Sequence, residues 1–485
     1  MNRSIRAFGV VIMLLFVAMV VQLANLQVVQ ASKLRHDPRN TRQAVADFSR
    51  PRGVIQTADG VVLAQSVPTK DQYRYQRTYP QGRDFAFVTG YLSFRYGTEG
   101  VEHAYADELA GRNLPLRAVD LQHFLSNTVR TADVTLTVRA DLQRVALAAL
   151  GPRVGAVVAL DPRDGSVLAL ASQPTYDPNG LASHDPTVEA ANFALANTDP
   201  LKPMLPRAFR ESYAPGSTFK TVTASAVLDR RPDLATKAYP VTNALKLPLT
   251  TNLLHNFGGE SCGGMLPDLF RVSCDTGFGG IGLDLGAGDL TGEAGQFGFN
   301  LVPPLDLPGV FASRFPPAAS FAQATPLLAF SAIGQSDVTA TPLQMALVAS
   351  AIANHGVIMV PHVMKTIVDS DGKPVRSYQP KAWITATSTG TAATVTQFMI
   401  SVVTGGTGTA VALPGVQVAA KTGTAEVDAT HTNAWMIAFA PADNPTIAVA
   451  VVLPGLTGVG NEVTGGVQAA PIVRKVIAAA LGVAG

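Results

Sequence analysis

A long apolar segment lies near the start of the chain. No charged residue occurs between Arg6 and Lys33, and this interval contains an unbroken apolar run. Because about 20 residues span a bilayer as a helix, we predict a short tail over 1–7 and a transmembrane anchor over 8–29. The alternative is a secretory signal with a cleavage site at Val29-Gln30-Ala31, but the run is longer than such a signal usually carries. Basic residues flank the segment on both sides, so charge alone leaves its orientation open.

Short runs that alternate with turns follow the anchor. Residues 33–51 are polar and basic and are typical of a linker. Gly53–Ile55 and Val61–Ala64 then flank Asp59-Gly60, which is the pattern of a β-hairpin with an Asp-Gly turn. We therefore predict a small β-rich domain over residues 30–130.

The rest of the chain begins and ends with paired apolar runs. The runs Ala156–Leu160 and Val167–Ala171 flank Asp164-Gly165, and a second pair near the end comprises Ala434–Phe439 and Ile447–Leu453. Helical spacing of apolar residues marks the stretches around residues 135–150 and 470–481. Helical and loop-rich sequence separates the two pairs, so we predict an α+β domain over 131–485 whose sheet joins both ends.

Composition narrows the class of protein. Of the 485 residues, 47% are apolar and only 15% are charged, with a net charge of +2. This excludes a disordered chain, which needs few apolar residues and a large net charge, and no basic field points to nucleic acid. Two cysteines cannot form a four-cysteine zinc site, and the eight histidines show no metal-binding spacing. We therefore predict neither a metal nor a cofactor.

A serine and a lysine three residues apart form the first candidate for chemistry. Ser217 and Lys220 would lie on one face of a helix, and Pro215-Gly216 before them suits a helix start. A lysine in this position can accept the proton of the serine if burial or positive charge disfavours its ammonium form. The same spacing recurs by chance in Ser370-Asp371-Gly372-Lys373, which we interpret as a polar turn.

The second candidate is Lys421-Thr422-Gly423-Thr424, which follows an apolar run and is typical of an edge strand. It presents a cation, two hydroxyls and a glycine that permits close backbone approach. A phosphate-binding loop beginning at Gly415 is excluded, because Ala420 occupies a position that must be glycine. The stretch Gly277–Gly282 fits a dinucleotide-binding pattern without its βαβ context, and we predict that it is a glycine-rich packing helix instead.

These motifs carry a family resemblance. Ser217-Thr218-Phe219-Lys220, Ser273-Cys274-Asp275 and Lys421-Thr422-Gly423 stand in the order of three motifs of penicillin-binding proteins and class A β-lactamases. Further segments resemble class B penicillin-binding proteins over nearly the whole chain, above all their short actinobacterial type called penicillin-binding protein A. These segments are Arg52–Ile55, Thr89–Tyr91, Gly97–Glu102, Thr341–Ala346 and Ala434-Trp435.

The resemblance implies a fold and an activity. The fold would be a penicillin-binding transpeptidase domain, with an antiparallel sheet and helices on its faces, a smaller non-catalytic N-terminal domain and one transmembrane helix. The activity would be that of a monofunctional peptidoglycan D,D-transpeptidase, which β-lactams inhibit covalently. Its partners would be peptidoglycan stem peptides and the inner membrane, and a membrane glycan polymerase would be a further candidate partner. The catalytic domain would lie outside the cytoplasm on a single-pass anchor.

The resemblance also implies roles for individual residues. Ser217 would attack the D-Ala-D-Ala bond, Lys220 would be its base, and Ser273 would relay a proton to the leaving amine. The motif that begins at Lys421 would hold the terminal carboxylate of the substrate through Lys421, Thr422 and Thr424, beside the close approach that Gly423 allows. Backbone N–H groups of Ser217 and Thr424 would form the oxyanion hole.

The chain departs from the family pattern at Asp275, where an asparagine is expected. An ionised carboxylate accepts hydrogen bonds but donates none, and near Lys220 it would favour the ammonium form and weaken the base. We expect either slower acylation or a protonated Asp275. Cys262 and Cys274 flank this region, and an extracytoplasmic location favours a disulfide between them over two free thiols.

Two other functions stay open at this point. Asp275 and the anchor also fit a catalytically weakened, penicillin-binding scaffold of a division or elongation complex. A β-lactamase or β-lactam sensor is the third hypothesis, which the N-terminal domain and the lack of an identifiable deacylating base disfavour.

Overall fold

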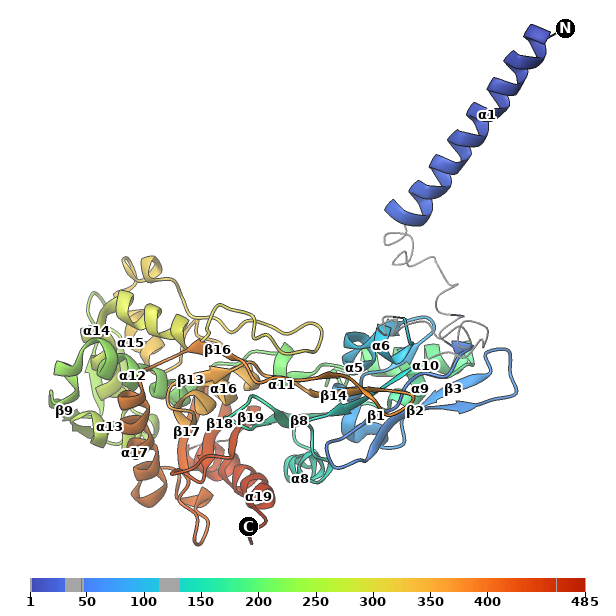
Figure 1. Cartoon of the computed structure of the whole chain (residues 1–485). Helices are drawn as coiled ribbons and strands as arrows, with labels where there is room; N and C mark the ends of the chain where they lie inside the picture. The colour runs from blue at the N-terminus through green and yellow to red at the C-terminus, as the bar shows by residue number, and fades with distance from the viewer. Residues whose placement is uncertain (1, 31–44, 46–47, 113–130, 459, 485) are drawn as a thin grey trace.

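The computed structural model describes residues 2–30, 45, 48–112, 131–458 and 460–484. Its first helix, α1 (Asn2–Ala24), continues into a π-helical turn, η1 (Asn25–Val29), and projects away from the folded body (Figure 1). One helix among the described residues, Arg3–Gln27, is long and apolar enough to cross a membrane, and its side chains are not buried. An N-terminal helix that fits a membrane anchor is therefore present, although it begins within the predicted tail. Ala31 of the possible cleavage site and most of the predicted linker lie outside the described residues.

A six-stranded sheet organises the N-terminal region. Its order is β15-β14-β6-β1-β2-β3, with β1 (Ile55–Gln56), β2 (Val62–Pro68), β3 (Tyr75–Thr78), β6 (Ala132–Leu136), β14 (Met364–Asp369) and β15 (Pro374–Ser377). The predicted hairpin is confirmed, since Ile55 pairs with Ala64 in antiparallel β1 and β2. Strands β14 and β15 come from much later in the chain, and β14 pairs with β6. The domain boundary predicted near residue 130 lies outside the described residues and stays a prediction.

A buried charge cluster lies at the centre of this region. Glu102, on α5 (Gly100–Ala104), accepts hydrogen bonds from Arg52 Nε at 2.7 Å and from Arg77 Nε at 2.5 Å. All three side chains are almost completely excluded from solvent. Burial alone would raise the pKa of the Glu102 carboxyl, but Arg77 and Arg52 together lower it. The three side chains therefore form a fixed ionised group that joins separate segments of the N-terminal region.

A second, five-stranded antiparallel sheet joins both ends of the larger region. Its order is β17-β18-β19-β7-β8, with β17 (Ala419–Glu426), β18 (His431–Ala440), β19 (Ile447–Thr457), β7 (Gly155–Leu160) and β8 (Val167–Gln173). Strand β19 pairs with β7, as Ala450 opposite Val158 shows. The prediction that one sheet contains both apolar pairs is confirmed.

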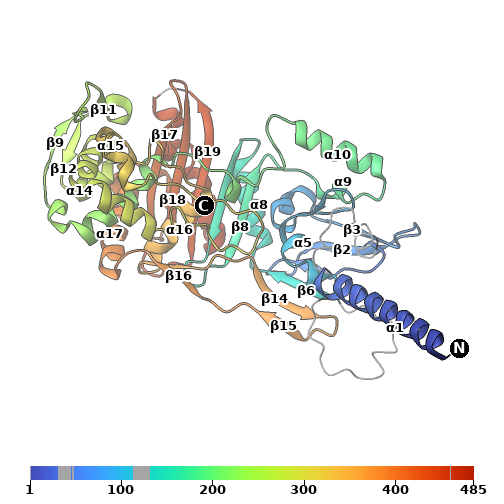
Figure 2. The same ribbon diagram turned by 90° about the horizontal axis from the view of Figure 1, so that it is seen from above.

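Side chains alternate across this sheet and build a core on each face. Val157 and Val449 pack against α8 (Ala140–Leu150) and α19 (Ala470–Leu481) on one face. Val158 and Ala450 belong to the core of the other face, which α16 (Pro342–Ala353) covers. Figure 2 shows α8, α16 and the sheet from above. The predicted helices near residues 142–150 and 470–481 are confirmed, whereas residues 135–136 belong to strand β6.

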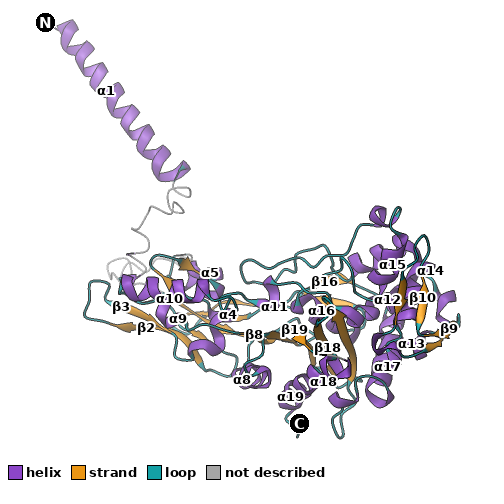
Figure 3. Cartoon of the chain, turned by 180° about the vertical axis from the view of Figure 1, so that it is seen from behind, coloured by secondary structure: helices purple, strands orange, loops and turns teal. Residues whose placement is uncertain are grey.

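Most of the remaining helices gather beside strand β17 (Figure 1), in a lobe that also carries β9 and β10 (Figure 3). This lobe contains α12 (Lys220–Arg230), α13 (Leu266–Val272), α14 (Asp275–Gln296), α15 (Thr325–Ala332) and α17 (Thr389–Gly405). Two small two-stranded sheets extend it: β9 (Tyr239–Thr242) with β12 (Cys262–Gly264), and β10 (Ala244–Lys246) with β11 (Leu253–His255). The glycines of 277–282 lie in α14 and pack closely, since a Cβ on Gly277 would lie 2.5 Å from a Leu269 methyl. The expected packing helix is confirmed.

Short elements connect these parts. They are η2 (Gly82–Phe85), α4 (Ala86–Thr89), β4 (Leu92–Ser93), β5 (Gly97–Thr98), α6 (Ala106–Leu109), α9 (Pro178–Leu181), α10 (Pro186–Thr198), α11 (Arg207–Arg210), η3 (Gly216–Phe219), η4 (Pro232–Ala235), η5 (Phe257–Gly259), η6 (Ala318–Phe321), β13 (Val357–Met359), β16 (Ala382–Thr385), η7 (Thr409–Val411), η8 (Gly460–Val463) and α18 (Gly465–Gln468). The second serine–lysine pair, at 370–373, lies in the turn between β14 and β15, where Lys373 N–H bonds to Asp369. Neither residue of this pair lies on an element that carries Ser217, Ser273 or Lys421.

Candidate active site

Ser217 lies on the single 3₁₀ turn η3, which runs directly into α12. Lys220 is the first residue of α12, so the serine and the lysine lie one turn apart. Gly216 has a positive φ of 54°, and a Cβ there would lie 2.7 Å from the carbonyl oxygen of Thr424. Glycine is therefore needed at this position both for the backbone conformation and for the approach of the turn to strand β17.

Lys220 is completely buried, and its ammonium group has three oxygen partners. Its Nζ donates to Asp275 Oδ1 at 2.7 Å, to the carbonyl oxygen of Ser273 at 2.7 Å and to Ser273 Oγ at 3.3 Å. Burial lowers the pKa of Lys220 below its ordinary value, and the neighbouring Asp275 carboxylate opposes that change. The ion pair with Asp275 thus favours the charged form of Lys220, whereas burial favours the neutral form, which can act as a base.

Ser273 and Asp275 occupy the junction between α13 and α14. Ser273 ends α13 in the left-handed conformation, with φ of 60°, and this bend directs its hydroxyl between two lysines. Its Oγ lies 2.8 Å from Lys421 Nζ and 3.3 Å from Lys220 Nζ. The sequence motif placed these residues near one another, but only the structure shows that one hydroxyl links both cations.

Asp275 has a larger part in the site than sequence reasoning gave it. Its Oδ2 accepts the backbone N–H of Phe257 at 3.1 Å, while its Oδ1 accepts from Lys220 and, at 3.5 Å, from Ser217 Oγ. Both oxygens accept hydrogen bonds, which fits an ionised carboxylate. Within the described residues, Asp275 and not Lys220 is the hydrogen-bond partner of the Ser217 hydroxyl.

Strand β17 closes the other side of the site and is an edge strand of its sheet, as predicted from the pattern around Lys421. Lys421 is fully buried and donates to Ser273 Oγ and, at 2.9 Å, to the carbonyl oxygen of Thr422. Burial, together with the positive charge of Lys220, lowers the pKa of Lys421 well below its ordinary value. A Cβ on Gly423 would lie 2.8 Å from the Pro215 carbonyl oxygen, so this glycine allows the strand to lie against the serine turn.

The two threonines of the motif have partners that the sequence did not indicate. The hydroxyl of Thr422 bonds to that of Thr407, and Thr424 Oγ1 accepts the N–H of Gly465 at 3.3 Å. Thr407 lies in a loop and Gly465 is the first residue of α18, and no local pattern marks either of them.

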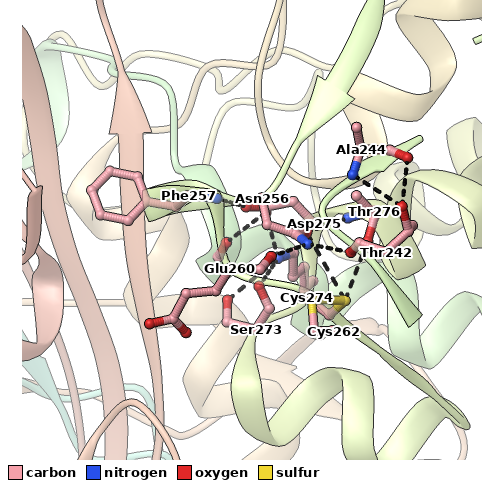
Figure 4. Close-up of a disulfide and its surroundings, with 12 residues drawn as sticks. Thr242, Ala244, Asn256, Phe257, Glu260, Cys262, Ser273, Cys274, Asp275 and Thr276 are labelled. Atoms are coloured by element: carbon pink, nitrogen blue, oxygen red, sulfur yellow. Dashed lines mark hydrogen bonds and ion pairs between the residues drawn. A yellow bond between two sulfur atoms is a disulfide. The ribbon is translucent and has the colours of Figure 1, made fainter. Parts of the chain in front are cut away.

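A disulfide fixes the wall beside Ser273 (Figure 4). It joins Cys262 of β12 to Cys274, which lies between the two site residues at the α13–α14 junction, and both cysteines of the chain are in this bond. Asn256 braces the same wall, because its Oδ1 accepts the N–H of Thr276 at 2.8 Å while its Nδ2 donates to Thr242 and Glu260 carbonyls. The position of Asp275 is therefore set by neighbours from a loop that carries none of the three motifs.

Ser217, Asp275 and Thr424 open into a pocket of about 290 Å³. Its other lining residues are Leu254, His255, Phe257, Leu327, Phe330, Ile333, Gln335, Ser336 and Glu426. Of these only Glu426 had a signal in the sequence, because it shares a face of β17 with Thr424 by the two-residue period of a strand. The described residues contain no cluster of three or more His, Cys, Asp or Glu that could hold a metal ion.

Comparisons with known proteins agree with this geometry. Residues 155–478 match the sequence model of the penicillin binding protein transpeptidase domain, and residues 52–133 match that of the penicillin binding protein A dimerisation domain. The chain therefore belongs to the penicillin-binding protein transpeptidase family.

Individual relatives span the whole chain. Peptidoglycan D,D-transpeptidase PbpA of Mycolicibacterium smegmatis is 40% identical over 99% of both chains, and the protein of that name from Mycobacterium tuberculosis is 38% identical over the same share. Among solved structures, the ceftriaxone acyl-enzyme complex of penicillin-binding protein A from M. tuberculosis is similar with a TM-score of 0.83 and 36% identity. That match covers 90% of this chain and all of the other.

Proposed function

We propose that the protein is a peptidoglycan D,D-transpeptidase that works through an acyl-enzyme on Ser217 and that β-lactams inactivate at the same residue. The observation that carries this proposal is the convergence of Ser217, Lys220, Ser273 and Lys421, which are linked by contacts of 2.7–3.5 Å through Asp275 and Ser273. Ser217 and Asp275 open this group of side chains to the pocket. The relatives named above as D,D-transpeptidases, and the acyl-enzyme structure, support the same conclusion.

Acylation then follows from the positions of these groups. Lys220, in its neutral form, takes the proton of Ser217 Oγ as this oxygen forms a bond to the penultimate D-alanine carbonyl carbon. The backbone N–H groups of Ser217 and Thr424 hold the resulting oxyanion, and such donors each contribute about 3–4 kcal/mol. The C–N bond breaks as the proton passes from Lys220 through Ser273 Oγ to the leaving D-alanine. An amine of a second stem peptide next attacks the ester and forms the cross-link.

Lys421 and its strand bind the substrate in this proposal. Lys421 Nζ, with the hydroxyls of Thr422 and Thr424, lies along the edge where the terminal carboxylate of the donor stem would bind, and Gly423 lets that strand approach. A buried ammonium without a carboxylate partner attracts an anion strongly. This supports binding of the terminal carboxylate of the donor stem at β17.

Asp275 sets the resting state of the base. The ion pair at 2.7 Å favours the ammonium form of Lys220, so the lysine must release a proton before it can accept one from Ser217. This contact is also the observation that favours the second candidate function, a catalytically weakened scaffold that binds penicillin but turns over slowly. The β-lactamase alternative would require rapid deacylation of the same ester.

The location of the enzyme follows from its substrate. Stem peptides lie outside the cytoplasm, so we propose that α1 anchors the chain in the cell membrane and that the catalytic region is extracytoplasmic. The disulfide supports this, because such bonds persist in oxidising compartments. Cross-linking also needs glycan strands, and the two matched domains are a dimerisation and a transpeptidase domain. A separate membrane glycan polymerase is therefore the partner we propose.

Intact-mass spectrometry of the full-length protein in detergent, after incubation with benzylpenicillin, tests the proposal. We expect one persistent adduct that maps to Ser217 and is absent from the Ser217→Ala variant. The Ser320→Ala variant, altered at an exposed serine, is the matched control and should keep the adduct. Folded wild-type protein without an adduct would contradict the proposal, and rapid loss of the adduct would favour a β-lactamase. An adduct without turnover of a thioester donor would favour the scaffold.

A further inference from the structure

Two ionisable side chains in the pocket have no partner. His255, at the end of β11, and Glu426, at the end of β17, are both exposed and both line the pocket. Neither side chain makes a hydrogen bond or ion pair within the described part of the chain. Asp275, the remaining acidic residue of the pocket, is instead paired with Lys220. Glu426 is thus the one carboxylate of this lining whose charge no neighbour compensates.

The position of Glu426 on strand β17 places it beyond the reaction centre. The strand runs from Ala419 to Glu426, so the order along it is Lys421, then Thr424, then Glu426. Successive residues advance by about 3.3 Å, which puts the Glu426 backbone roughly 7 Å past Thr424 on the same face of the strand.

This order matches the order of groups in an extended donor peptide. A donor whose carboxylate lies at Lys421 and whose scissile carbonyl lies at Thr424 continues in the same direction toward Glu426. The residue that precedes the two D-alanines would therefore lie beside Glu426, within reach of a long side chain. The pocket lining also includes apolar side chains that can pack against the methylene groups of such a side chain, namely Leu254, Leu327, Phe330 and Ile333.

We propose that Glu426 is a specificity-determining residue that binds a cationic side chain of the donor stem. The substrate class is a stem peptide whose residue before D-alanyl-D-alanine has a long aliphatic side chain ending in a free ammonium group. A stem in which this amine is acylated lacks the ion pair and is a poorer donor. The inference rests on the proposed transpeptidase function, because it uses the direction of the donor along β17.

The expected effect is moderate. Glu426 is exposed, and an exposed ion pair contributes up to about 1 kcal/mol, which corresponds to about a fivefold preference. Salt screens such a pair, so the preference should decrease as ionic strength rises, whereas a preference that came from packing of the methylene groups would not.

The experiment compares two thioester donor analogues that end in D-alanyl-thioglycolate and differ only in whether the side-chain amine is free or acetylated. Thiol release by the full-length protein gives kcat/KM for each. We expect the wild type to prefer the free amine about fivefold, Glu426→Gln to remove this preference, and Glu426→Lys to reverse it. The control Asp443→Asn removes a negative charge from the turn between β18 and β19 and should keep the preference.

Benzylpenicillin separates failure of this inference from failure of the proposed function. Acylation by benzylpenicillin does not use the amine, so adduct formation by the wild type reports on the proposed function independently of this inference. If the wild type forms the adduct yet shows no preference between the analogues, or if Glu426→Gln keeps the preference, the inference is overturned while the proposed function stands. If the wild type forms no adduct, the proposed function itself fails.

Discussion

The protein contains two buried clusters with the same formal composition, two basic side chains around one carboxylate, and they behave in opposite ways. In the N-terminal region, Glu102 lies between Arg52 and Arg77, and each arginine donates to a different carboxylate oxygen. In the catalytic region, Asp275 pairs with Lys220 alone, while Lys421 bonds to a hydroxyl and a carbonyl. The first cluster is fully paired, and the second has one cation too many for its carboxylate.

The kind of base decides what each cluster can do. An arginine guanidinium does not lose its proton in proteins, so the arginine cluster stays ionised and lowers the pKa of Glu102. A buried lysine can lose its proton, and burial lowers the pKa of both Lys220 and Lys421. The comparison teaches that burial of charge stabilises a fold where the pairing is complete, and supplies a movable proton where it is incomplete.

Exchange of the lysine for an arginine should have the largest effect. Lys220→Arg keeps the positive charge but removes a group that can accept a proton, so we expect acylation by benzylpenicillin to slow about a thousandfold. The rate of adduct formation, followed by mass spectrometry, measures this. The reciprocal variant Arg52→Lys is the control and should acylate within about twofold of the wild type. An equal loss of acylation rate in both variants would contradict the idea that proton transfer by a lysine distinguishes the cluster around Asp275 from the cluster around Glu102.

Neutralisation of the N-terminal carboxylate should affect stability and leave the chemistry intact. Glu102→Gln leaves two buried guanidinium groups without a counter-charge, which costs about 3–5 kcal/mol of unfolding free energy. Denaturant titration of the full-length protein measures this loss, and Glu260→Gln, at an exposed position, should change stability by less than about 0.5 kcal/mol. Folded Glu102→Gln protein should still be acylated. Loss of acylation without loss of stability would contradict the structural role of this cluster.

Neutralisation of Asp275 should have the smallest effect and the opposite sign. Asp275→Asn removes the charge that opposes the lowering of the Lys220 pKa, so this pKa should fall further and more lysine should be neutral at a given pH. We expect acylation to become about tenfold faster, with the rising limb of its pH profile at lower pH. Acylation rates over roughly pH 5–9 test both points. A rate that is unchanged or lower would show that Asp275 does not restrain the base.

Local patterns predicted much of the fold. The strands around Val158 and Val449 were predictable because fully buried strands give continuous apolar runs. Asp164-Gly165 marked where the first pair reverses. Ser217 and Lys220 were predictable as neighbours because they belong to one helical turn. The edge position of Lys421 followed in the same way from its own segment.

Contacts between distant segments were not predictable. Nothing in residues 364–377 indicates that β14, which pairs with β15, also pairs with β6, because no local pattern specifies a partner strand that lies more than 200 residues earlier in the chain. The hydrogen bond between Ser217 and Asp275, and the brace from Phe257 to Asp275, depend on how helices pack and on one left-handed residue, Ser273. These features come from tertiary structure, which one sequence does not encode in any local signal.

The sheet that joins both ends of the catalytic region has a consequence for biosynthesis. Strands β7 and β8 are synthesised first, but the strand that pairs with β7 begins only at Ile447. Until then, one edge of β7 has no partner, and such edges promote association between chains. Folding of the catalytic region must therefore wait until most of the chain has been synthesised, which makes folding slow and exposes the chain to aggregation. Truncation before β19 would leave a chain that contains Ser217 and Lys220 but cannot assemble the site around them.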